Sequence, residues 1–196
     1  MIFRDMDLFL SLCIGVGLSA ACGFRIFVPL LVMSIAAKAG RLDFVPAFEW
    51  MGSDVALITF AVATCFEIAG YFIPWLDNAL DVIATPAAIV AGTIATASMV
   101  GGMDPYLKWT LAVIAGGGAA GLVQGATVLV RGTSTATTAG IGNPVVATAE
   151  LGGSILMSIL AVLVPVIAMF ILFVMMFYVG KKVMPKFLGR RRNAVE

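Results

Sequence analysis

The sequence predicts an all-α, polytopic membrane protein with about five to six membrane segments, because one span takes about 20 apolar residues. Hydrophobic residues make up 61% of the chain and charged residues only 12%. An ordinary soluble domain carries about 25% charged residues. The apolar residues also fall in long runs separated by short polar stretches. A soluble core built from 196 residues cannot bury this much apolar surface.

The basic residues are concentrated at the C-terminus. Residues 1–180 are predicted to form one transmembrane domain and residues 181–196 a basic tail that holds six of the 12 Lys and Arg residues. The positive-inside rule places this tail in the cytoplasm. A topology anchor explains the tail better than a nucleic-acid site does, so no nucleic-acid partner is expected.

The first apolar segment, residues 8–37, is too long for one straight span. Gly23 and Pro29 flank Arg25 and favour a break there. Either one bent helix or two half-helices meeting near Arg25 is predicted, and the side of the N-terminus stays open. Because the apolar run resumes at Ile26, the segment is interpreted as retained in the membrane rather than cleaved as a signal peptide.

Two further spans are expected before residue 101. Residues 38–54 are hydrophilic and contain aromatic side chains, which favours the membrane interface. Residues 55–74 form a span interrupted by Glu67. A tight turn at Asp77 and Asn78 leads into a span over residues 80–100.

The second half of the chain begins with a span over residues 106–130. Gly117, Gly121 and Gly125 share one helix face, which favours close helix packing. Residues 131–144 are predicted to be a polar loop, either exposed or dipping into the membrane.

This loop carries Arg131, Thr133 and Thr135, and Asn143 is expected to cap the helix that follows. Counting back from a cytoplasmic C-terminus places the loop outside and residues 38–54 inside.

The last apolar region, residues 144–180, exceeds one straight span. A re-entrant or interfacial piece near residues 144–152, followed by a kinked helix to Gly180, is predicted. A weak internal repeat is a further hypothesis, because the spacing of Ile14, Gly17 and Ala20 recurs one hundred residues later.

Residue types limit the chemistry. The chain has no histidine, and its three cysteines form no CxxC pair. Cys13, Cys22 and Cys65 lie in apolar runs and are expected to be buried, reduced thiols. No nucleotide-binding or hydrolase motif is present. No metal site, cofactor or catalytic residue is therefore predicted.

Polar residues inside the apolar segments are the candidates for function, because charge within a membrane is costly and usually functional or paired. They are Arg25, Glu67, Gln124 and Glu150. Arg25 is expected to pair with Glu67 or Glu150, and the sequence does not choose between them. The group is interpreted either as a structural ion pair or as a polar transport site.

Asp77 and Asp81 form a second, weaker candidate. Four residues apart at a helix start, they share a face. Such carboxylates either cap the helix or hold a cation against a lipid diphosphate.

Four stretches resemble a bacterial family of multi-pass inner-membrane proteins, the 4126 family of domains of unknown function. The resemblance covers roughly residues 9–180 and implies a small inner-membrane protein, with no activity or site residue attached. The stretches are GLSAACGFRIFVPLL (17–31), IPWLDNALDVIATPAA (73–88), IAGGGAAGLVQG (114–125) and RGTSTATTAGIGNP (131–144).

A small channel or transporter for an ion or small solute, homo-oligomeric within the lipid bilayer, is the favoured hypothesis. It rests on the intramembrane charges, the broken helix and the small-residue faces. The alternative is an accessory or assembly subunit of a larger membrane complex. A Mg²⁺-dependent lipid-phosphate enzyme using Asp77 and Asp81 is the most remote hypothesis, and no enzyme activity is expected.

Overall fold

The computed structural model describes residues 2–71 and 73–192; within them, the side chains of residues 2–5, 74–81, 179 and 182–192 lie outside the description. All regular elements in this part of the chain are helices, as predicted. Three helices are long and apolar enough to cross a membrane, and a fourth span results if one bent pair is counted as a unit. The three are Val82–Met99, Pro105–Thr138 and Asn143–Leu163. Length and composition of the described helices thus support a membrane protein and do not confirm the five to six segments predicted.

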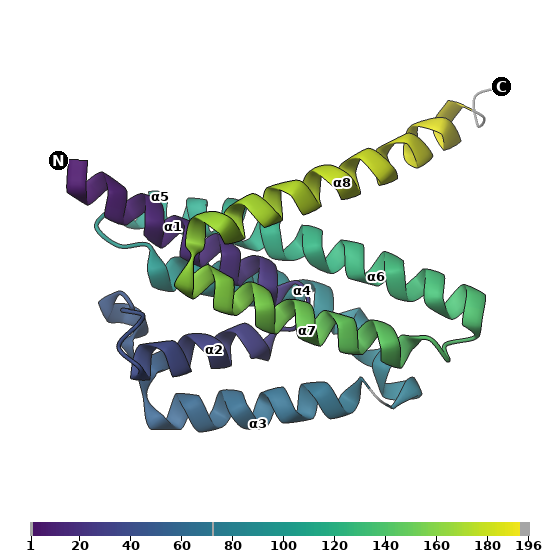
Figure 1. The fold of residues 1–196 in the computed structure, drawn as a ribbon, viewed down its shortest axis with the longest axis horizontal. Helices are drawn as coiled ribbons and strands as arrows, with labels where there is room; N and C mark the ends of the chain where they lie inside the picture. Colours follow the sequence, from purple (N-terminus) through teal and green to yellow (C-terminus); the bar gives the residue numbers. More distant parts are fainter. Residues whose placement is uncertain (1, 72, 193–196) are drawn as a thin grey trace.

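The predicted break in the first segment is confirmed. Helix α1 (Ile2–Cys22) ends just before Arg25, and α2 (Phe27–Lys38) begins just after it. Figure 1 shows α2 running back toward the end of the molecule at which α1 starts. Gly23 allows this turn to approach α6, because a Cβ there would lie 2.6 Å from the Cβ of Val123.

The segment between α2 and α3 contains a short 3-10 helix, η1 (Pro46–Gly52). Helix α3 (Asp54–Gly70) follows, with the Ser53 hydroxyl accepting the Ala56 N–H at its start. Together η1 and α3 are the bent pair, with an angle of 63° between them.

Helix α4 (Pro74–Met99) starts earlier than predicted. Asp77 and Asn78 therefore lie inside this helix, and the turn predicted at these residues is wrong. Pro74 explains the early start, because proline is favoured at the first helical position, where no hydrogen bond to its nitrogen is needed.

One continuous run of 34 helical residues follows. It consists of α5 (Pro105–Leu111), a π-helical turn η2 (Ala112–Gly117) and α6 (Gly118–Thr138). The predicted polar loop is therefore wrong over residues 131–138, which continue α6. Only residues 139–142 form the turn, with left-handed backbone at Ala139 (φ 52°) and Gly140 (φ 88°).

The last apolar region breaks at Val164, not near residue 152. Helix α7 (Asn143–Leu163) is regular throughout, so the predicted re-entrant piece is wrong. Helix α8 (Pro165–Arg192) continues through most of the predicted tail. Proline cannot donate the backbone hydrogen bond that would continue α7, which explains the position of the break.

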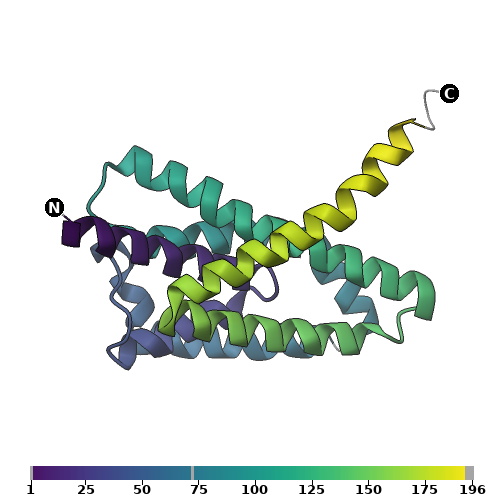
Figure 2. The same cartoon turned by 45° about the horizontal axis from the view of Figure 1, so that its top comes forward.

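Helices α7 and α8 run in opposite directions. The α6–α7 turn and the C-terminal end of α8 consequently lie at one end of the molecule, away from the N-terminus and η1 (Figures 1 and 2). The sequence-based count had placed the 131–144 stretch and the C-terminus on opposite sides of the membrane. That count treated residues 144–180 as one crossing, whereas in the structure the chain turns back at Val164.

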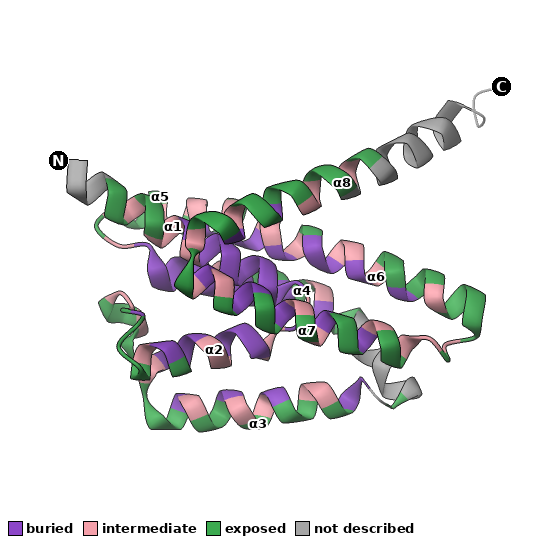
Figure 3. Cartoon of the chain, viewed as in Figure 1, coloured by how far each residue is buried: buried purple, intermediate pink, exposed green. Residues whose placement is uncertain are grey.

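Helix α1 lies at the centre and packs on α4, α7 and α8. Small residues make this possible: a Cβ on Gly15 would lie 2.9 Å from the Thr96 Cα, and one on Gly17 would lie 2.9 Å from the Ala161 Cβ. Buried residues are concentrated on α1 and α4, whereas α3 and α8 carry large exposed stretches (Figure 3). Of the predicted glycine face, Gly117 and Gly121 pack on α4, and Gly125 has no such neighbour.

Candidate functional site: a buried charged cluster

Glu150 is the centre of the buried charged cluster, whose other members are Arg25, Arg131, Glu67 and Tyr71. The Arg131 Nε donates to both Glu150 carboxylate oxygens, at 2.9 and 3.1 Å, and the Arg131 Nη2 contacts the same carboxylate. The Arg25 Nη2 lies 3.7 Å from Glu150 Oε2 and donates to the Ala147 carbonyl at 2.8 Å. Of the two partners left open by the sequence, Arg25 thus pairs with Glu150.

The helices bring these three residues together from distant parts of the chain. Arg25 lies at the α1–α2 break, Arg131 on α6 and Glu150 on α7. Their exposed fractions are only 2%, 4% and 5%. Such burial of three charges is costly unless they are paired, which the shared carboxylate achieves.

Arg131 was predicted in a polar loop, but it belongs to a buried helix face. Gln124, Thr127 and Arg131 lie three and four residues apart on α6, and all three are buried. This spacing is a helical signal that the sequence carries and that the loop prediction overlooked.

Tyr71 is a member of the cluster that sequence reasoning missed. It is the residue that ends α3, and 7% of it is exposed. The guanidinium carbons of Arg25 and Arg131 lie 3.8 and 4.1 Å from the centre of its ring. Two cations stacked on one aromatic ring gain electrostatic stabilisation from its π-system. The available signal was its position four residues after Glu67.

Glu67 caps a half-helix instead of pairing with Arg25. Its carboxylate accepts the backbone N–H groups of Ile26 at 2.7 Å and Phe27 at 3.0 Å, at the start of α2. These are N–H groups that a helix N-terminus leaves without a partner, and negative charge is favourable there. A carboxylate of α3 therefore fixes the position of the break.

The cluster is balanced in charge but incomplete in hydrogen bonding. Arg25 and Arg131 offset Glu67 and Glu150. Nevertheless, Nε and Nη1 of Arg25 are buried and have no hydrogen-bond partner within the described part of the chain. A buried guanidinium normally has its donors satisfied, so these two N–H groups are available to an acceptor.

The other predicted residues lie away from this cluster or outside the description. Thr133 donates to the Leu129 carbonyl, and the Asn143 amide donates to the Thr135 hydroxyl at 3.1 Å across the α6–α7 turn. Asn143 does not cap α7: Gly142 is the capping residue, without a side-chain hydrogen bond. The side chains of Asp77 and Asp81 lie outside the description, so their role stays a prediction.

The cysteines differ from one another. All three are free, but only Cys13 and Cys22 are buried; the prediction of a buried Cys65 is wrong, since this residue lies on the exposed face of α3. Among the residues searched, no group of three or more Cys, Asp or Glu side chains is arranged to hold a metal ion.

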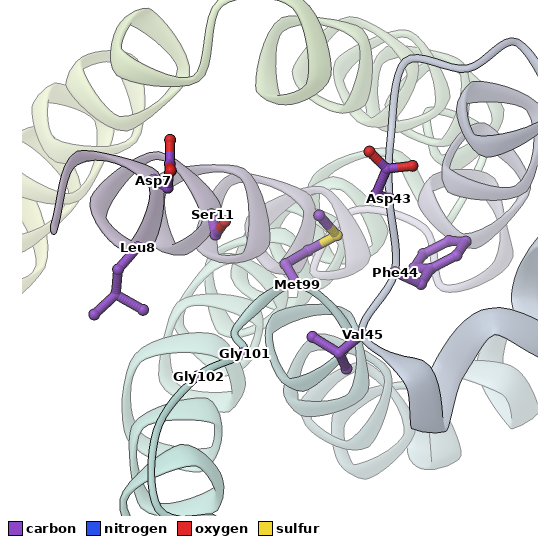
Figure 4. Close-up of a pocket in the computed structure, with 9 residues that line it drawn as sticks. All are labelled: Asp7, Leu8, Ser11, Asp43, Phe44, Val45, Met99, Gly101 and Gly102. Atoms are coloured by element: carbon purple, nitrogen blue, oxygen red, sulfur yellow. The ribbon is translucent and has the colours of Figure 1, made fainter. Parts of the chain in front are cut away.

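Two of the cavities along the described helices are lined by acidic side chains. The first, of about 500 Å³, lies between α3, α4 and the start of α2, and both Glu67 and Tyr71 line it. The second, of about 320 Å³, lies near the N-terminal end and is lined by Asp7 and Asp43 from different segments (Figure 4). Both of these carboxylates are exposed, in contrast to the buried charged cluster.

Comparison with known proteins agrees with the resemblance noted from the sequence. The domain of unknown function DUF4126 matches residues 12–182. No curated protein and no solved structure matches the chain. The match contains all four charged residues of the cluster and nearly every helix, and the chain therefore belongs to the DUF4126 family.

Proposed function

We propose that this protein is a small membrane transporter whose solute binds at the cluster of Arg25, Glu67, Arg131 and Glu150. The observation that carries the proposal is a charge-balanced cluster, buried among apolar helices, at the break between two half-helices. Broken helices with polar groups at the break are the usual binding sites of secondary transporters. Charges buried in a membrane are otherwise rare, because they are expensive to insert.

The incomplete hydrogen bonding of Arg25 supports a binding role over a purely structural one. A structural network is stabilising only when all its members are satisfied. Nε and Nη1 of Arg25 have no acceptor among the residues that the structure describes. A solute that supplies a carbonyl, hydroxyl or carboxylate oxygen would complete the network.

The proposed location is the inner membrane, with the C-terminus in the cytoplasm. The six basic residues after residue 180 support this orientation. Since the α6–α7 turn lies at the same end as the C-terminal part of α8, this turn is then cytoplasmic too.

Flux through reconstituted liposomes tests the proposal. Radiolabelled glycine, acetate and chloride serve as a zwitterion, a weak acid and an inorganic anion. We expect flux of at least one solute, reduced at least about tenfold in Arg25→Lys, because lysine keeps the charge but loses the planar donor array. Lys38→Arg is the matched control, since Lys38 pairs with Asp54 at the surface. Flux equal to that of protein-free liposomes for all three solutes, or unchanged flux in Arg25→Lys, would contradict the proposal.

The proposed homo-oligomer is tested by the mass of the particle purified in nanodiscs. A particle containing only copies of this chain supports a self-contained transporter. A stoichiometric second protein would instead favour the accessory-subunit alternative.

A further inference from the structure

The cavity between α3 and α4 is an apolar chamber with a polar end. Most of its lining is hydrophobic, and its two polar residues, Glu67 and Tyr71, belong to the buried charged cluster. The lining residues are Ile26, Phe27, Ala63, Phe66, Glu67, Gly70, Tyr71, Ile83, Ala84 and Ala87. Its volume of about 500 Å³ falls within the range of about 300–1,000 Å³ that is common for small-molecule sites.

The cavity opens on the outer surface of α3 and α4. Phe66 and Ile83 line it and are 74% and 59% exposed on the outer surface of α3 and α4. Helix α3 packs mainly on α2 and makes little contact with α4, so the two walls are separated. Figure 1 shows α3 at the periphery of the bundle. Because the residues at this opening are apolar, the opening suits entry of an amphiphile from a bilayer.

We propose that this cavity binds an uncharged amphiphile with a hydroxyl-bearing head group, such as a long-chain alcohol, a diacylglycerol or a quinol. The apolar tail lies between α3 and α4, and the head group lies against Glu67 and Tyr71. The inference goes beyond the proposed function, because it assigns this cavity a ligand of its own and does not depend on which solute the charged cluster carries.

The charges around the polar end select the head group. An anionic head meets the Glu67 carboxylate, which lines the cavity, and is repelled. A cationic head is attracted by Glu67 but repelled by Arg25 and Arg131, which both stack on Tyr71 behind the cavity wall. An uncharged hydroxyl avoids both penalties and donates a hydrogen bond to the Glu67 carboxylate, which is a strong, charge-assisted interaction.

The unpartnered donors of Arg25 lie next to this polar end. The Tyr71 ring contacts both the cavity and the guanidinium of Arg25. In the described part of the chain, Nε and Nη1 of this guanidinium have no acceptor. A shift of this ring brings the head-group oxygen within reach of those donors. The same hydroxyl thus donates to Glu67 and accepts from Arg25, which matches the charge balance of the cluster.

Photolabelling of the full-length protein in phosphatidylcholine nanodiscs tests the proposal. The probes are a diazirine-bearing hexadecanol and a diazirine-bearing palmitic acid with the same chain length. We expect the alcohol to label peptides of α3 and α4 at least about tenfold more than the acid, since one charge-assisted hydrogen bond is worth about this factor in affinity.

Variants of α3 and α4 locate the label. Ala63→Trp and Ala87→Trp each fill the cavity from a different wall and leave the residues of the charged cluster unchanged. Ala69→Trp is the matched control on α3, because Ala69 is exposed and does not line the cavity. Labelling should be lost in both filling variants and kept in the control, with wild-type elution in size-exclusion chromatography showing that each variant is folded.

Two results would overturn the inference: equal labelling by alcohol and acid, or labelling that persists when the cavity is filled. Either would mean that bilayer lipid covers this surface without recognition of its head group. Selective labelling in a protein that shows no flux would instead contradict only the transport proposal.

Discussion

Replacement of Glu150 by glutamine exchanges one carboxylate oxygen for an amide nitrogen. We expect this substitution to destabilise the protein more than any other exchange of a single side-chain atom. The substitution keeps the shape of the side chain and removes the one carboxylate that both Arg131 and Arg25 share. Both guanidiniums then stay buried, with exposed fractions of 4% and 2%, and lose their common counter-charge.

The magnitude follows from the burial of the partners. Breaking a buried ion pair from one side costs about 3–5 kcal/mol, because the remaining charge is left uncompensated. The glutamine carbonyl still accepts one hydrogen bond from Arg131, which recovers about 1 kcal/mol. We therefore expect the free energy of unfolding to fall by about 3 kcal/mol.

Reversible unfolding of the purified protein in mixed dodecylmaltoside and dodecyl sulfate micelles measures this change. Glu49→Gln is the matched control, since Glu49 is exposed on η1, and it should alter stability by less than about 0.5 kcal/mol. Adding Arg131→Met to Glu150→Gln restores the charge balance. The loss of unfolding free energy in the double variant should be about 2 kcal/mol smaller than the sum of the losses in the two single variants. A coupling of this size is typical of residues in one network.

The reasoning fails if Glu150→Gln unfolds within about 0.5 kcal/mol of the wild type, which is the range of ordinary surface changes. It also fails if the effects of Glu150→Gln and Arg131→Met on the free energy of unfolding are additive. Either result would mean that Arg131 and Arg25 are not held by Glu150 in the membrane.

Three further predictions concern packing, capping and topology. Gly116→Ala should lower the free energy of unfolding by about 1–3 kcal/mol in the same assay, because the added Cβ would collide with α4. Gly118→Ala, where a Cβ meets open space, should be neutral or stabilising. Glu67→Gln should lower the free energy of unfolding by about 1–3 kcal/mol. One amide oxygen then replaces two carboxylate oxygens that accept N–H groups at the start of α2. Stability equal to that of the wild type would contradict the capping role of Glu67. Single cysteines are introduced at Ile141 or Lys181 in a background with the native cysteines replaced by alanine. Both should react with an impermeant maleimide from the same side of the membrane. Labelling from opposite sides would contradict the α7–α8 turn.

Sequence reasoning identified most members of the charged cluster but not their arrangement. Arg25, Glu67 and Glu150 stood out because charges are rare in apolar runs. Which glutamate pairs with Arg25 depends on which helices are neighbours, and one sequence does not contain that information. Tyr71 was missed for a related reason: an aromatic residue at a helix end is ordinary until two guanidiniums are found against its ring.

The polar stretch over residues 131–138 shows why local composition misled. Threonine and glycine have low helix propensity in water, which favoured a loop. Among other helices in an apolar medium, backbone groups have to be satisfied within the segment, and a helix achieves this. The threonine hydroxyls also bond back to carbonyls four residues earlier, as Thr133 does to Leu129 and Thr137 to Thr133.

The sequence by itself determined the all-helical membrane class and the break near Arg25. The first follows from the free energy of transferring apolar residues from water, and the second from the backbone limits of glycine and proline. Both are local properties of the chain. The tertiary structure alone decided that α8 turns back at Val164, that Glu150 serves two arginines and that Glu67 caps α2. These features depend on the packing of helices far apart in the chain, where small residues allow close approach and buried charges have to find partners.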